Sequence, residues 1–197
     1  MNRAAIGFRV HSGWAAMVAV SLEKGLPLVL QKQKLLLVKT FSYTFRQPYH
    51  TAEKMPLADG VEFVRGVEQE SCELALAGIQ ATLKELKQLE YEVRDCALLL
   101  ASGRALPEFE KILSSHALIH TADGELFRNS IRKACSRAKL AVNAVKERDL
   151  LAAAAKSTEK KTEFLLKHIG ALGKSVGPPW TQDEKLAALS AWHALSN

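Results

Sequence analysis

Several common signatures are missing from this chain of 197 residues, and each absence excludes a class of protein. Neither G-x-x-x-x-G-K-S/T nor G-x-G-x-x-G occurs, so the two commonest phosphate-binding loops are absent. Cysteine is scarce. Cys72, Cys96 and Cys135 lie far apart without C-x-x-C spacing, which argues against a disulfide framework and a structural zinc knot. We expect all three to be reduced and buried, as in a cytosolic protein.

Targeting segments and long hydrophobic runs are also missing. Arg9 and His11 interrupt the apolar start of the chain, which therefore lacks a signal-peptide block, and the longest uncharged stretches are too short for a membrane span. The sequence thus predicts a cytoplasmic protein with no membrane partner. With 48% hydrophobic and 24% charged residues the composition is globular, and we expect residues 1–197 to form a single domain.

The first forty residues show strand patterns. Apolar runs at 4–11 and 14–22 flank a Ser12-Gly13 turn, and a third run covers 26–40. Two-residue connections containing glycine are hairpin signals, so we expect three strands in an antiparallel meander.

The rest of the chain alternates between helical and strand patterns. Apolar residues at helical spacing predict a long helix over about 61–90, and an unbroken apolar run at 96–102 predicts a strand covered on both faces. The other expected elements are a helix over 107–114, one from a Thr121 cap to about Lys139, a strand at 140–147, a helix from an Asp149 cap to about 169, a Gly/Pro break at 170–180, and a last helix from a Thr181 capping box to about Leu195.

Residues 41–60 are interpreted as a long loop rich in aromatic residues, and loops of this length in compact domains are usually functional. Phe41, Tyr43 and Phe45 alternate, which indicates an extension of the third strand or a small arm. Exposed aromatics there would mark a partner contact, including a homodimer contact, whereas the plainer alternative is that they pack back on the domain.

The resulting order of elements is similar to the ribonuclease H-like fold, which RNases H, Holliday-junction resolvases, transposases and actin-like ATPases share. Residues 6–13 followed by 15–20 resemble the first hairpin of resolvases and actin-like ATPases. Asp183-Glu184-Lys185 before a small-residue helix resembles the final helix of resolvases. The fold class we expect is α/β, ribonuclease H-like, with a mixed sheet in which an antiparallel three-strand meander is followed by parallel strands and flanking helices.

The resemblance implies a two-metal site, from which this sequence departs. In the family, carboxylates of the first strand, the fourth strand and the last helix hold the ions, because Mg²⁺ takes oxygen ligands. Here Arg9 stands at the place of the first-strand Asp, and we expect it to point into the cleft and to neutralise Glu147 or an anionic ligand. Glu147, Asp183 and Glu184 remain as candidate catalytic carboxylates, although helix capping also explains the last two. We expect no cofactor and no bound metal, with Mg²⁺ only if these carboxylates form a rearranged nuclease site.

Two turns are candidate ligand sites. Ser102 and Arg104 follow a buried strand, which is where open α/β sheets bind ligands, and a solvated turn is the alternative. His11, Ser12 and Gly13 form the first hairpin turn, which in actin-like ATPases holds phosphate through backbone N–H groups. A nucleotide-binding module therefore stays open as an alternative.

His116 and His120 are four residues apart, a spacing that lets two histidines on a helix share a metal. Because His120 precedes the expected Thr121 cap, we expect the pair to straddle a loop. The alternatives are a pocket wall, where a histidine hydrogen-bonds a ligand, and an ordinary helix start.

The chain carries 27 Lys and Arg against 21 Asp and Glu, a formal charge of +6. Arg128, Arg132 and Lys139 stand 4 and 7 residues apart and predict a shared basic helix face that would track a phosphate backbone, the alternative being a solvated face. We therefore expect a non-catalytic domain that binds nucleic acid or a protein partner. The alternatives are a metal-dependent phosphodiesterase and an ATPase-like nucleotide-binding module.

Overall fold

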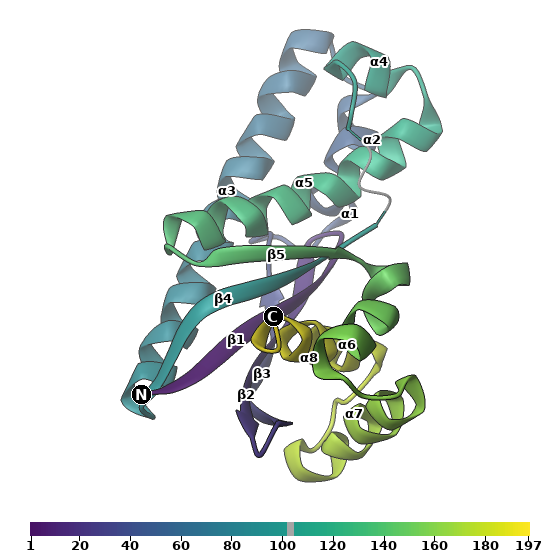
Figure 1. Ribbon diagram of the computed structural model, residues 1–197. Helices are drawn as coiled ribbons and strands as arrows, with labels where there is room; N and C mark the ends of the chain where they lie inside the picture. Colours follow the sequence, from purple (N-terminus) through teal and green to yellow (C-terminus); the bar gives the residue numbers. More distant parts are fainter. Residues whose placement is uncertain (102–104) are drawn as a thin grey trace.

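A mixed five-stranded sheet forms the centre of the computed structural model, which describes residues 1–101 and 105–197 (Figure 1). The strands are β1 (Asn2–His11), β2 (Trp14–Glu23), β3 (Leu26–Leu36), β4 (Tyr91–Leu100) and β5 (Ala141–Lys146), in the order β3-β2-β1-β4-β5. β1 and β3 each pair antiparallel with β2, whereas β4 runs parallel to β1 and β5 runs parallel to β4. This is the predicted meander followed by parallel strands.

Helices cover both faces of the sheet. They are α1 (Tyr43–Arg46), α2 (Pro48–Ala52), α3 (Leu57–Gln88), α4 (Phe109–Leu113), α5 (His116–Arg137), α6 (Leu150–Thr158), α7 (Thr162–Val176) and α8 (Gln182–Leu195), with a 3₁₀ turn η1 (Glu147–Asp149) after β5. α3 and α5 lie on one face, and α6, α7 and α8 lie on the other (Figure 1).

Alternation along β4 divides the buried side chains between two cores. Leu98 packs with α3 and α5, whereas its neighbours Ala97 and Leu99 pack with α8. The three cysteines are free and buried, as the sequence predicts. On β1, a Cβ at Gly7 would lie 1.9 Å from the carbonyl oxygen of Ala187, so only glycine lets the start of α8 approach the strand this closely. This approach brings the N-terminus of α8 to the end of β1.

Residues 41–60 are not the long loop that we expected. They form α1, α2 and the start of α3, and the stretch after β3 contains no strand extension. Pro48 lies in the first turn of α2 and Pro56 directly precedes α3, two positions that tolerate proline. Phe45 and Tyr49 pack against the core. Phe41 and Tyr43, in contrast, are 45% and 61% exposed, so only part of the aromatic set packs back on the domain, and the homodimer contact stays a prediction.

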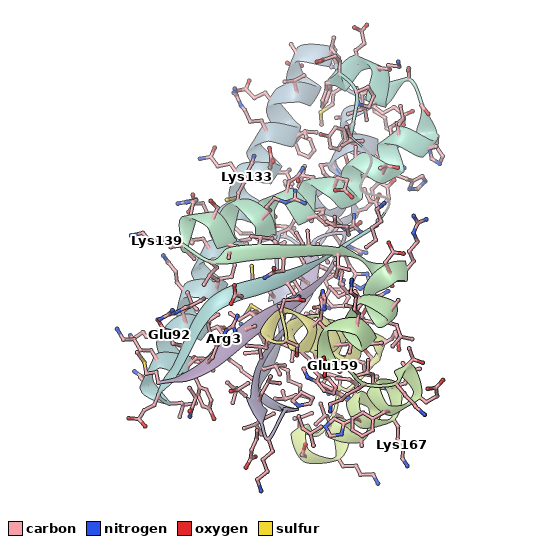
Figure 2. The ribbon with its side chains drawn as sticks, viewed as in Figure 1. Arg3, Glu92, Lys133, Lys139, Glu159 and Lys167 are labelled. Atoms are coloured by element: carbon pink, nitrogen blue, oxygen red, sulfur yellow. The ribbon has the colours of Figure 1, made fainter. Side chains whose placement is uncertain are left out.

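Three helix boundaries also differ from expectation. α5 begins at His116, and the Thr121 hydroxyl donates to the carbonyl of Ala117 inside the helix instead of capping it. The helix predicted from Asp149 to 169 is two helices, because Glu159 adopts a left-handed conformation with φ 55°. Figure 2 labels Glu159 at the end of α6. The side chain of Asp149 makes no cap bond, and α7 continues past Gly170 to Val176.

The capping box at Thr181 is confirmed, with its hydroxyl accepting from the N–H of Asp183. Among the helices of the described residues, none combines the length and the apolar character needed to cross a bilayer.

Candidate functional site

A cleft of about 540 Å³ opens where β1, β4 and β5 end and α8 begins. Its lining comes from β1, β4 and the residue after it, α5, the turn η1 that follows β5, and α8: Arg9, Val10, Leu99, Leu100, Ala101, Arg128, Glu147, Arg148, Gln182 and Leu186. Because the three strands run parallel, their carboxyl ends meet at one edge of the sheet, which is where open α/β sheets bind ligands.

Arg9 is the central charge of the cleft. Its Nε donates to Glu147 Oε2 at 3.0 Å and its Nη2 donates to Glu147 Oε1 at 2.8 Å, a two-bond fork. Its Nη1 donates to the Oδ1 of Asp183. The guanidinium thus joins the end of β1 to the residue after β5 and to the first turn of α8.

His11 extends this network. Its Nε2 lies 2.8 Å from Oδ1 of Asp183, and its ring stacks on Trp14 with a centroid separation of 4.4 Å. Lys34 in turn places its ammonium 4.5 Å from the Trp14 ring centroid. Asp183 therefore receives hydrogen bonds from both Arg9 and His11.

The ion pairs favour the charged forms of Asp183 and Arg9. Burial alone would raise the pKa of Asp183, but the hydrogen bonds from His11 and Arg9 outweigh it and the pKa lies below its ordinary value. The hydrogen bond to Glu147 raises the pKa of Arg9. At neutral pH the site is a guanidinium flanked by two carboxylates.

The residues at this edge do not fit the Mg²⁺ ions that the fold family implies. Glu147 and Asp183 both direct oxygens at Arg9, which stands between them. A cation and a divalent ion about 4 Å apart repel by about 8 kcal/mol at an effective dielectric of about 20. Glu184, the third candidate carboxylate, turns to its own helix end, where Oε2 accepts from the N–H and hydroxyl of Thr181 at 2.7 and 2.6 Å.

The first hairpin turn is partly covered. Gly13 has φ 84°, and a Cβ there would lie 2.7 Å from Cγ of Arg46. The carbonyl of Ser12 accepts from Nε of Arg46 at 3.3 Å, and the carbonyl of Gly13 accepts from the N–H of Leu37. Ser102 and Arg104, the other predicted turn, lie outside the described residues.

Of the predicted basic face, Arg128 and Arg132 lie one turn apart on α5, whereas Lys139 does not belong to the helix. Arg128 lines the cleft, where its Nη1 donates to Glu125 at 3.1 Å, and its buried Nε has no hydrogen-bond partner among the described residues. Arg132 donates to the side chain of Asn129. Lys139 lies just beyond the end of α5 (Figure 2). It adopts a left-handed conformation with φ 60°, which ends the helix.

His116 and His120 do not straddle a loop. Both belong to α5, one turn apart, and their Nε2 atoms lie 3.0 Å from each other. His50 of α2 joins them, with its ring centroid 4.4 Å from that of His120. Sequence reasoning missed His50, because no spacing rule links it to a pair so far along the chain.

Comparison with solved structures agrees with this architecture. The chain is similar to RuvC of Thermus thermophilus, with 14% identity and a TM-score of 0.53 over 96% of this chain and 92% of that chain. T. thermophilus RuvC in complex with a Holliday junction substrate matches with 13% identity and a TM-score of 0.53, over 97% and 91% of the two chains. A Ppx/GppA family member from Aquifex aeolicus matches with 10% identity and a TM-score of 0.39, over 80% and 40%.

No protein-family model matches the sequence, and neither does any curated protein. The structural likeness, together with the strand order, defines the class: the chain has the ribonuclease H-like fold that its sequence predicts.

Proposed function

We propose that this chain is a ribonuclease H-like domain, formed by residues 1–197 as one unit, that binds nucleic acid in its sheet-edge cleft without cleaving it. One observation carries the proposal: Arg9 forms a fork to Glu147 and also bonds Asp183. These bonds engage both oxygens of Glu147 and Oδ1 of Asp183, and they place a cation where a two-metal hydrolase would need its ions.

Arginine side chains around the cleft support a polyanionic ligand. Arg128 and Arg148 line it beside the ion-paired Arg9, and the side chain of Arg148, whose Nε lies 3.6 Å from Oδ1 of Asp149, is 77% exposed. Arginine binds phosphate through its planar fork, and the formal charge of +6 favours approach to a polyanion. A structural neighbour of this chain, T. thermophilus RuvC, is described in complex with a Holliday junction.

Binding is tested by fluorescence anisotropy with labelled duplex and four-way-junction DNA over a series of salt concentrations. We expect the affinity to fall steeply with salt, because bound phosphates release counterions. Arg148→Ala should weaken binding to both DNAs and lower the slope of log K against log salt by about 1 if it contacts one phosphate.

Arg65→Ala is the matched control, since Arg65 is an exposed arginine of α3 that pairs only with Glu62 among the described residues and does not line the cleft. Equal effects of the two substitutions would overturn the cleft as the binding surface, and the absence of DNA binding would favour a protein partner. Cleavage of the DNA with Mn²⁺ would favour the phosphodiesterase, and thermal stabilisation by ATP would favour the nucleotide-binding module.

A further inference from the structure

α2 packs against α5 (Figure 1). Three histidines of these two helices meet there, and none of them lines the cleft. His50, His116 and His120 each offer a ring nitrogen, and the three nitrogens lie within 4.8 Å of one another. The ring centroid of His50 is 4.4 Å from that of His120 and 5.3 Å from that of His116. Within the described residues, this is the one group of three or more metal-ligand side chains at such distances.

A buried carboxylate fixes the orientation of His50. Its Nδ1 lies 2.5 Å from Oδ2 of Asp123, whose side chain is 2% exposed and whose Oδ1 also accepts from the N–H of Tyr49 at 2.7 Å. An imidazole that donates from Nδ1 leaves the lone pair of Nε2 free. This carboxylate–imidazole pair is the arrangement in which a protein holds a histidine ligand for a metal.

The helices place the other two ligands by local geometry and hold them by packing. His116 and His120 are one turn apart on α5, so they project from the same helix face. Ile119 and Ala122, between and beyond them, are fully buried and form a small core to which Tyr49 of α2 belongs. The interface between α2 and α5 is therefore packed. This packing fixes the relative positions of the backbone segments that carry the three histidines.

The spacing of the ring nitrogens is compatible with a shared metal ion. The Nε2 atoms of His116 and His120 face each other at 3.0 Å. Three nitrogen ligands at about 2.0–2.1 Å from a zinc ion lie about 3.3 Å apart in tetrahedral geometry, close to this spacing. His116 and His120 are exposed, which leaves one side of the group open to solvent.

We propose that His50, His116 and His120 bind a divalent transition metal of the zinc class, with water in the fourth position and Asp123 as the positioning residue for His50. Imidazole nitrogen suits Zn²⁺, Co²⁺, Ni²⁺ or Cu²⁺ and not Mg²⁺. The site is separate from the sheet-edge cleft, and it does not depend on the proposed nucleic-acid binding.

The test uses the full chain without a polyhistidine tag, stripped with a chelator and titrated with Zn²⁺ by calorimetry and with Co²⁺ by visible absorption. We expect one equivalent of each ion to bind, Co²⁺ to give the intense absorption of a tetrahedral site, and Zn²⁺ to raise the unfolding temperature. His50→Gln leaves the His116–His120 pair intact, so it separates a three-ligand site from a simple surface pair. His116→Gln is an exposed substitution that tests the site if the buried one fails to fold.

His50→Gln and His116→Gln should each abolish the tetrahedral Co²⁺ spectrum. Asp123→Asn removes only the positioning carboxylate and should lower Zn²⁺ affinity by about 10- to 100-fold. The two histidine substitutions should lower it by more than that. His168→Ala, in α7, is the control and should bind Zn²⁺ as the unaltered chain does. The proposal would be overturned by unchanged Zn²⁺ affinity in His50→Gln or by an octahedral Co²⁺ spectrum of the unaltered chain. It would also be overturned if the unaltered chain bound Zn²⁺ no more tightly than His116→Gln does.

Discussion

The guanidinium of Arg9 and the carboxylate of Glu147 form a two-bond fork across the cleft, although they lie 138 positions apart in the chain. β4 separates their strands in the sheet, so the fork spans from β1 to the residue that follows β5. Asp183 adds a carboxylate from α8 to the same guanidinium. Arg9 is therefore the cation that pairs with both carboxylates, those of Glu147 and Asp183, at this edge.

Replacing Arg9 by Asp should convert the edge from a site that repels divalent ions into one that attracts them. We expect Arg9→Asp to lose about 1–3 kcal/mol of stability, because two charge-assisted partners lose their donor. We also expect Mn²⁺ to raise its unfolding temperature. The unaltered chain should show no Mn²⁺ response at this edge.

Arg9→Gln is the control for that experiment, since it removes the cation without adding a carboxylate. It should be destabilised and should stay insensitive to Mn²⁺. Stabilisation of the unaltered chain by Mn²⁺, lost on changing Glu147 to Gln, would contradict our assignment of Arg9.

The stability that Asp183 contributes should depend on pH in one direction. Its pKa is lowered in the folded chain, so its contribution is fully present above the ordinary carboxyl range and is lost as the pH falls through the lowered folded pKa. We expect Asp183→Asn to be less stable than the unaltered chain at neutral pH, with the difference vanishing between about pH 5 and pH 1.

Urea unfolding of both proteins across this range measures the difference. Asp59→Asn, at an exposed position in the first turn of α3, controls for the general effect of removing an acid. A gap between Asp183→Asn and the unaltered chain that stays constant to low pH would show that the ion pair with Arg9 and His11 is not what Asp183 contributes.

Gly7 should be intolerant of any side chain. A Cβ there would meet the Ala187 carbonyl at 1.9 Å and the Ser190 hydroxyl at 2.6 Å, so Gly7→Ala must push α8 away from β1. We expect a loss of about 2–3 kcal/mol or more in thermal or urea unfolding. Gly66→Ala, in the exposed middle of α3 with no atom within 4 Å of the new Cβ, should instead gain about 0.5–1 kcal/mol. A similar loss in both variants would rule out the close approach of α8 as the reason.

Glu184 should behave as a helix cap and not as a catalytic carboxylate. Its bonds to Thr181 complete a capping box, in which glutamine serves as well as glutamate. Glu184→Gln should therefore keep its stability, whereas Glu184→Ala should lose about 0.5–1 kcal/mol in urea unfolding. Equal losses in the two variants would show that the charge of Glu184, and not its cap bonds, is what the fold requires.

Local patterns in the sequence determined much of the fold. The hairpin turn at Gly13, the helical stripe of α3 and the Thr181 capping box each depend on neighbours a few residues apart, so periodicity and turn chemistry reveal them. The meeting of Arg9 and Glu147 was also predictable in outline, because parallel strands end at the same edge of a sheet.

Only the tertiary structure decided the rest. α1 and α2 are too short to be stable alone. The packing of α2 against α3 and α5, and of α1 against α2, stabilises them where the composition indicated a loop. Arg128 reaches the cleft because of the way α5 lies on the sheet. The packing of α5 against α3 and the sheet sets this position, and the spacing of residues along α5 does not. His50 meets His116 and His120 for the same physical reason: contacts between elements distant in the chain arise from the burial of apolar surface, which no local pattern encodes.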